Sequence, residues 1–186
     1  MEYKDYYKVL EVDTLEEAYH GANRIIQLVD EKLRITVKPG AYDGQLLRVK
    51  SKGGKGSSAE HRGDMYVRIR VSPSIQFKRK GDDLYSQHTL DLYTVVLGGE
   101  TIIATLTGQA KVKIAAGTQN GKSIRIKGKG MQVHEKSGAF GDLLIQVQVL
   151  IPEKLTEKQR ELFEQLNSTD QWIGRLQHEP KFYGRI

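Results

Sequence analysis

The fold is decided by a stretch that occurs twice, Gly40-Ala41-Tyr42-Asp43-Gly44-Gln45-Leu46-Leu47-Arg48-Val49-Lys50-Ser51-Lys52-Gly53 and, 77 residues later, Gly117-Thr118-Gln119-Asn120-Gly121-Lys122-Ser123-Ile124-Arg125-Ile126-Lys127-Gly128-Lys129-Gly130. The glycines and basic residues that keep this spacing are Gly40/Gly117, Gly44/Gly121, Gly53/Gly130, Arg48/Arg125, Lys50/Lys127 and Lys52/Lys129. Upstream, Gly21/Gly98, Ile25/Ile102 and Ile26/Ile103 keep it as well, and Gly63-Asp64 matches Gly141-Asp142 at a spacing of 78. So many matches in register indicate two copies of one module, at about residues 5–75 and 82–152.

Both modules have the pattern of β-sheet proteins. Leu33–Val37 and Leu144–Val149 alternate apolar and polar residues, which is typical of half-buried strands, and glycine-containing turn signals separate such runs. Two copies are too few for a solenoid. The sequence therefore predicts a mainly β protein, with two tandem similar β-sandwich domains followed by a short C-terminal α-helix.

The start of the first module is ambiguous. Residues 5–15 align with residues 82–92, which the repeat places at the start of the second module. We expect Tyr7–Val12 to serve as the first strand, although its local pattern also fits a short helix.

A helix is predicted after Pro152. Thr156 and Gln159 fit a capping box, and Asn167 is a plausible left-handed stop, so the helical segment is placed at 153–167. The apolar residues of this segment form one stripe, Leu155, Leu162, Phe163 and Leu166. Residues 168–186 show no period and are expected to be a tail.

Composition excludes several kinds of chemistry. The chain has 186 residues, 29 Lys plus Arg against 23 Asp plus Glu, and no cysteine, which excludes disulfides, cysteine metal sites and thiol nucleophiles. No apolar run approaches the ~20 residues of a membrane span, and no signal peptide is visible, so a cytoplasmic location is expected. The five histidines have no metal-ligand spacing, and no catalytic motif is present. We expect no enzyme activity, catalytic residue, metal or cofactor.

Two features admit binding functions. The lysine-rich segments 50–56 and 127–130 fit either contact with nucleic acid or other anions, or solvated turns that protect sheet edges. The run Ile25–Val29 is too apolar for a simple alternating strand. It fits either burial between two sheets or a groove in which Ile26 and Leu28 face an extended peptide.

Several longer segments resemble one family. They are Thr14–Gly21, Val37–Gly40, Phe77–Leu84, Leu97–Glu100 and Gly128–Met131, together with Gly63-Asp64 and Gly141-Asp142. In this order they resemble the C-terminal substrate-binding region of DnaJ-family co-chaperones, from about Thr14 to Leu166. The absence of cysteine matches the zinc-less, CbpA-like branch. The resemblance implies a first sandwich at 13–75, a second at 76–152 and a dimerisation helix that carries Leu155, Leu162, Phe163 and Leu166.

The N-terminal segment 1–12 resembles a different part of that family. Asp5–Leu10 looks like the start of a J domain, but the remainder of that domain and the glycine/phenylalanine-rich linker are missing. No His-Pro-Asp tripeptide, which the family uses to stimulate the ATPase of its DnaK-type partner, occurs in the chain. The expectation is therefore a co-chaperone fragment that does not stimulate this ATPase.

The resemblance also implies binding sites. Non-native polypeptides would bind a groove formed by Ile26, Leu28, Val67 and Ile69. The acidic C-terminal tail of a DnaK-type chaperone would bind near Arg24 and Lys32. The expected partners are thus unfolded polypeptides, a DnaK-type chaperone and a second copy of the chain, with no membrane. The alternative is a curved-DNA-binding architectural protein of CbpA type.

Overall fold

The structure, a computed structural model, describes residues 6–12, 14–28, 31–54 and 62–169. The chain forms two compact units, Met1–Leu150 and Ile151–Ile186. The first unit contains both predicted modules, and the second contains the C-terminal helix. The prediction of a mainly β protein with a short C-terminal helix is confirmed.

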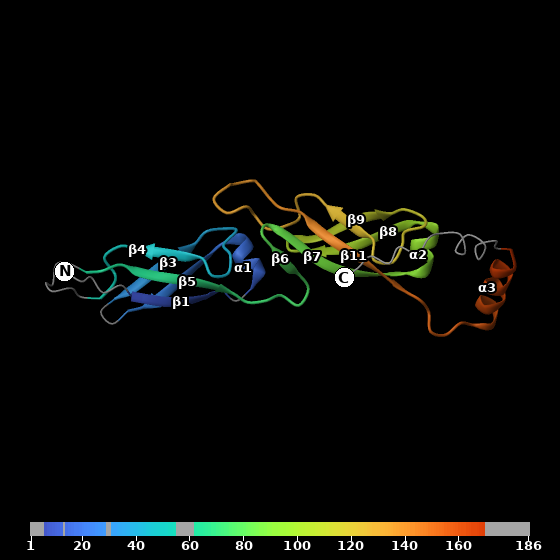
Figure 1. The fold of residues 1–186 in the computed structure, drawn as a ribbon, viewed down its shortest axis with the longest axis horizontal. Coiled ribbons are helices and arrows are strands. Elements are labelled where there is room, and N and C mark those ends of the chain that lie inside the picture. The colour runs from blue at the N-terminus through green and yellow to red at the C-terminus, as the bar shows by residue number, and fades with distance from the viewer. Residues whose placement is uncertain (1–5, 13, 29–30, 55–61, 170–186) are drawn as a thin grey trace, which may run out of the picture. The chain divides into compact units, whose positions relative to one another are not determined.

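Within the described residues, the first module contains two sheets and one short helix (Figure 1). Its elements are β1 (Tyr6–Val12), α1 (Leu15–His20), β2 (Ala22–Gln27), β3 (Lys32–Val37), β4 (Leu46–Val49) and β5 (Met65–Val71). The larger sheet has the order β1-β5-β4, with β1 parallel and β4 antiparallel to the central strand β5. The smaller sheet is the antiparallel pair β2-β3.

The second module repeats this order with one additional strand. Its elements are β6 (Lys78–Lys80), β7 (Asp83–Asp91), α2 (Leu92–Leu97), β8 (Gly99–Thr105), β9 (Gly108–Ile114), β10 (Ser123–Ile126) and β11 (Leu143–Leu150). The larger sheet has the order β10-β11-β7-β6, and β8 and β9 form the smaller one. The helices α1 and α2 begin 77 residues apart, as do β4 and β10, so the repeat in the sequence is a repeat in the structure.

Each module buries the facing sides of its two sheets. In the first module, Ile26, Ile35 and Val37 of the smaller sheet share a core with Met65, Val67 and Ile69 of β5. Residues of the second module, among them Leu84, Met131 and Leu143, belong to the same apolar cluster, so the core is continuous across the junction of the modules. A second cluster joins Leu90, Val95, Ile114 and Val147.

The predicted alignment of the first strand is wrong by one residue. Tyr6 pairs with Met65 in the first module, and Leu84 pairs with Leu143, the equivalent of Met65, in the second. Tyr6 is therefore equivalent to Leu84, a spacing of 78, whereas the sequence alignment gave 77. The chain has one more residue, Asp13, between β1 and the helix cap than it has in the second module. Because side chains alternate along a strand, this shift exchanges its two faces and leaves Tyr7 68% exposed.

The short helices α1 and α2 were not predicted. Each has a side-chain cap, because Thr14 Oγ1 accepts a hydrogen bond from Glu17 N and Asp91 Oδ1 accepts one from Thr94 N. Each cap satisfies a backbone N–H of the first helical turn, for which no carbonyl of a preceding turn is present. The sequence Thr14-x-x-Glu17 is a signal for a helix N-terminus, but α1 is too short to show the apolar periodicity by which longer helices are predicted.

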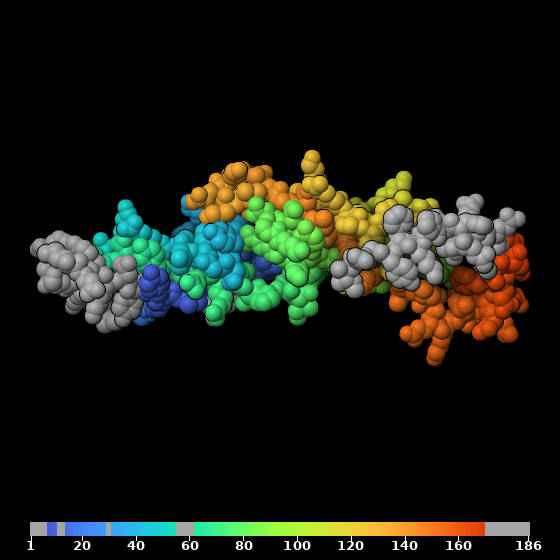
Figure 2. All heavy atoms as spheres, viewed as in Figure 1, coloured from blue at the N-terminus to red at the C-terminus, as the bar shows by residue number. Residues whose placement is uncertain are grey.

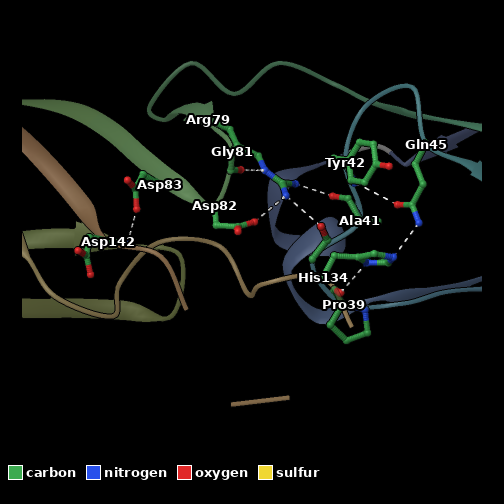
Figure 3. A network of polar contacts seen from close by, with 11 residues as sticks. Pro39, Ala41, Tyr42, Gln45, Arg79, Gly81, Asp82, Asp83, His134 and Asp142 are labelled. Carbon is green, nitrogen blue, oxygen red and sulfur yellow. Dashed lines mark hydrogen bonds and ion pairs between the residues drawn. The ribbon is translucent and has the colours of Figure 1, made fainter. Parts of the chain in front are cut away.

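The two modules are joined through Arg79 of β6 (Figure 3). Its guanidinium donates hydrogen bonds to the carbonyl oxygens of Ala41 and, at 2.9 Å, Gly40 in the first module, and its Nε donates to Gly81 O. Burial lowers the pKa of Arg79, and the nearby carboxylate of Asp82 opposes this effect. Backbone carbonyls thus solvate this half-buried cation, and these hydrogen bonds hold β6 against the first module.

The loop between β10 and β11 makes further contacts with the first module. His134 contacts Gln45 and the carbonyl oxygen of Pro39, and the ring of Phe140 stacks on Tyr19 of α1. A Cβ atom at Gly40, whose φ is +81°, would lie 2.4 Å from Gln132 O, so this position requires glycine. The orange atoms of this loop lie against the blue and cyan atoms of the first module in Figure 2.

The C-terminal helix α3 spans Glu157–Thr169, so the predicted start at 153 is wrong by four residues and Leu155 lies before the helix. Its predicted cap is present, because Gln159 N donates to Thr156 Oγ1 and Thr156 N donates to Gln159 Oε1. The predicted stop at Asn167 is wrong by two residues, because the hydroxyls of Ser168 and Thr169 bind the carbonyl oxygens of Gln165 and Leu166 and extend the last turn.

Candidate functional site

The predicted groove residues lie deeper than the sequence suggested. Ile26 is 5% exposed, and Val67 and Ile69 are buried at the centre of the first module. Of the two interpretations left open for this strand, burial between the two sheets is the one that fits Ile26, and an exposed groove position does not. Leu28 is half-buried at the end of the smaller sheet, and the exposed isoleucine of β2 is Ile25, at 65%.

An apolar rim surrounds this buried centre. Among the partly buried apolar residues that pack on this core, we call four the apolar rim: Leu28, Leu33, Leu47 and Val49. Leu33 lies across from Ile26 in the smaller sheet, and Leu47 and Val49 lie across from Val67 and Met65 in the larger one. The rim thus combines residues from both sheets where they are incompletely covered.

Two lysines hold the sheets together near the rim. Lys52, in the loop after β4, contacts both carboxylate oxygens of Glu31 at 2.7 Å, just before β3 begins. Lys8 of β1 donates a hydrogen bond of 2.7 Å to Gln27 O at the end of β2. The lysine-rich segment therefore has at least one structural use, and the charge of Lys52 is neutralised within the module.

The two predicted tail-binding cations lie on opposite faces of the smaller sheet. Arg24 shares the inner-facing positions with Ile26 and makes an ion pair of 2.6 Å with Glu17 of α1. Lys32 lies on the outer face, in register with Gln27, and is exposed. Sequence reasoning missed Arg34, which is also exposed and lies beside Ile25 on this outer face. The alternation of side chains along β3 is the signal that places Lys32 and Arg34 together.

Equivalent carboxylates organise the loop after β4 and the loop after β10. Asp64 accepts hydrogen bonds from Ser51 N and Arg48, and Asp142 accepts them from Gly128 N and Arg125. The backbone donor first, and the arginine second, lower the pKa of each carboxyl. Each aspartate therefore stabilises its module at neutral pH and loses this contribution as the pH falls through its lowered pKa.

The described residues contain no cluster of three histidine, aspartate or glutamate side chains that could hold a metal ion. Within the same part of the chain, no helix has the length and apolar character that a membrane crossing requires. What the first module offers chemically is a partly open apolar surface with basic residues near it. A surface of this kind can be covered by apolar side chains of another molecule.

Comparison with known protein families decides the family. The family model described as the DnaJ C terminal domain matches residues 9–152. The chain belongs to the DnaJ C-terminal domain family. The "Chaperone protein DnaJ" of Caldicellulosiruptor bescii is 41% identical over 147 residues, which cover 77% of this chain and 38% of that protein. The protein of the same name from Brucella anthropi is 39% identical over 166 residues, which cover 89% of this chain and 42% of that protein.

This DnaJ C-terminal domain thus spans about two fifths of the length of the curated relatives it matches. The matched residues begin at Val9, inside β1, and include the rest of both modules. The repeat places a weaker rim in the second module, because Thr105, which is buried, stands at the position of Leu28 and Ala110 stands at that of Leu33. The other two rim positions stay apolar in the second module, as Ile124 and Ile126, so the two modules differ at the rim positions of the smaller sheet.

Proposed function

We propose that this DnaJ C-terminal domain binds segments of non-native polypeptide at the apolar rim of its first module. The observation that carries the proposal is the set of half-buried side chains Leu28, Leu33, Leu47 and Val49 above a packed core. Their partial exposure gives an apolar surface that a client side chain can cover without unfolding the module. Ile26, Val67 and Ile69 support this surface from below.

The chemistry of the rim suits a client site of low sequence specificity. Aliphatic side chains offer no directional hydrogen bonds, so affinity follows the apolar area covered. Each client side chain that is fully buried contributes about 1.5–3 kcal/mol before the cost of ordering the client. Binding of this kind is weak enough to allow release to another chaperone.

The whole chain provides the first test. We expect it to suppress aggregation of a chemically unfolded protein, because its rim covers exposed apolar segments. We expect it not to accelerate ATP turnover by a DnaK-type chaperone, because this sequence has no His-Pro-Asp tripeptide. Light scattering and a steady-state ATPase assay measure the two properties. If aggregation is unchanged when this chain is present in excess, the client proposal is contradicted. Faster ATP turnover would contradict only the expectation about the DnaK-type chaperone.

For the acidic tail of a DnaK-type partner, a more accessible binding surface is present than the predicted pair Arg24 and Lys32. We propose that an acidic tail of a DnaK-type chaperone binds the outer face of the smaller sheet, at Lys32 and Arg34. Ile25, which is exposed and in register with Arg34, would accept an apolar residue of the tail. Arg24 is less available because Glu17 already neutralises it.

We also propose that α3 forms a homodimer contact. Leu162 and Leu166 of the helix are 51% and 62% exposed, Leu155 just before it is 37% exposed, and the helix has no buried residue among those described. Because an isolated helix of this length is marginal in water, a second copy would stabilise it.

We expect Phe163→Asp with Leu166→Asp to convert a dimer to a monomer in light scattering after size-exclusion chromatography. Glu157→Ala with Glu164→Ala, on the opposite face, should leave the dimer intact. A monomeric mass for the unmodified chain at micromolar concentration would refute the contact.

A further inference from the structure

The sheet β1-β5-β4 of the first module (Figure 1) has an outer face that carries aromatic and basic side chains. Its inner face packs on the core through residues such as Leu10, Val67 and Ile69, so the alternate residues of each strand point away from the core. These outer residues are Tyr7 and Val9 of β1, Leu46 and Arg48 of β4, and Tyr66, Arg68 and Arg70 of β5. We call this set the outer face of the first module.

Two tyrosine rings stand side by side on the outer face. Tyr7 and Tyr66 are in register on neighbouring strands, and their rings stack with 5.4 Å between centroids and 18° between planes. Each ring covers one side of the other, while Tyr7, on the edge strand β1, remains 68% exposed. Because Tyr66 already holds the ring of Tyr7 in place, a planar group can stack on its exposed side at little cost in side-chain ordering.

Arginines surround this pair of rings. Arg48 is in register with Tyr66, and Arg68 and Arg70 follow Tyr66 at alternate positions of the same strand. Arg48 is bound to Asp64, whereas Arg68 and Arg70 are exposed and make no ion pair within the described part of the chain. Glu11, in register with Arg70, adds one acidic residue to these strands. After Asp64 and Glu11 are counted, the outer face keeps a net positive charge beside the exposed ring.

The second module does not have this combination of residues. The positions equivalent to Tyr7, Tyr66, Arg68 and Arg70 are occupied there by Tyr85, Leu144, Gln146 and Gln148. Residues 74–78 of the chain also lie beside that face, because they line one hollow together with its strands. The stacked rings and the arginines are therefore particular to the first module, and the second module supplies an internal control.

We propose that the outer face of the first module binds a short single-stranded polynucleotide, with a base stacked on Tyr7 and phosphates beside Arg68 and Arg70. An aromatic ring can stack on any base, and an arginine binds phosphate through its charge and its paired N–H donors. The bases of a duplex are already stacked on one another, so the exposed ring favours a single strand. This site lies on the opposite side of the sheet from the apolar rim, goes beyond the proposed function and does not depend on it.

Fluorescence anisotropy with a labelled oligothymidylate about 12 nucleotides long tests the site. Tyr7→Ala should weaken binding about tenfold or more through the lost stacking, whereas Tyr7→Phe should keep the affinity within about threefold. Tyr85→Ala, at the equivalent position of the second module, should leave the affinity unchanged. Melting temperatures confirm that each variant is folded.

The arginines are tested by the dependence of binding on salt. Arg68→Gln with Arg70→Gln installs the residues that the second module has at these positions, so the fold should be retained. This variant should reduce the slope of log affinity against log salt concentration by about 1.4, because each phosphate contact with a single strand contributes about 0.7. Tyr7→Ala should leave this slope unchanged. An oligouridylate should bind within about fivefold of the oligothymidylate, because stacking and phosphate contacts do not read the sugar.

Several results would overturn the proposal. Equal affinity for a DNA duplex of the same length would leave only a general attraction between phosphates and a basic chain. Unchanged binding by a folded Tyr7→Ala chain, or equal losses for Tyr7→Ala and Tyr85→Ala, would remove the stacking site. Displacement of the oligonucleotide by an equal concentration of polyglutamate of the same charge would assign the face to acidic polypeptides instead. Binding of only one of the two oligonucleotides would contradict a site that does not read the sugar.

Discussion

Ile26→Asp should destabilise the first module by about 4 kcal/mol or more, because it replaces a buried aliphatic side chain and places a charge without a partner in the core. Ile26 is 5% exposed and packs with Ile35, Val67 and Ile69. A loss of this size is a large part of the stability of an ordinary domain, about 5–15 kcal/mol. Urea or thermal unfolding monitored by circular dichroism measures it.

The neighbouring residue provides the matched control. Ile25 precedes Ile26 on the same strand but is 65% exposed, so Ile25→Asp should change stability by no more than about 0.5 kcal/mol. If Ile26→Asp unfolds at the same temperature as the unmodified chain, the side chain lies in an open groove instead. The burial of Ile26 described above would then be wrong.

Most of the fold was predicted from the repeat in the sequence. Glycines and basic residues at a constant spacing, such as Gly40/Gly117 and Arg48/Arg125, predicted two like modules, and the structure places both members of each pair in equivalent loops and strands. These residues are informative because a turn, or an arginine bound to an aspartate, tolerates few substitutes.

The first strand was harder to predict. Tyr6–Val12 contains apolar or aromatic residues at both parities, so its pattern fits either face toward the core. The position of the strand is set by pairing with β5, a partner distant in sequence, and by the additional residue before α1. Neither is visible in the local pattern.

The candidate site was predicted only in part. The run Ile25-Ile26 identified an unusually apolar strand, but two adjacent isoleucines do not show which of them faces the core. Pairing with β3 and packing on β5 decide it, and these are tertiary effects. Lys52 was assigned to a basic loop because its partner Glu31 is remote in sequence.

The central claim is tested most directly by measuring how the Leu28→Asp variant and the Leu106→Asp variant bind an apolar, unstructured peptide. Both leucines are half-buried and pack on the same core, Leu28 after β2 and Leu106 after β8 at the corresponding end of the second module. A similar loss of stability is therefore expected from each change, and melting temperatures check this. A fluorescence titration of the two variants and the unmodified chain then compares the two modules.

The claim that clients bind the rim of the first module predicts that Leu28→Asp weakens peptide binding about tenfold or more, the loss of one buried aliphatic contact. Leu106→Asp should retain the affinity of the unmodified chain within about threefold. Equal losses in the two variants, or full affinity in a folded Leu28→Asp chain, would contradict the account.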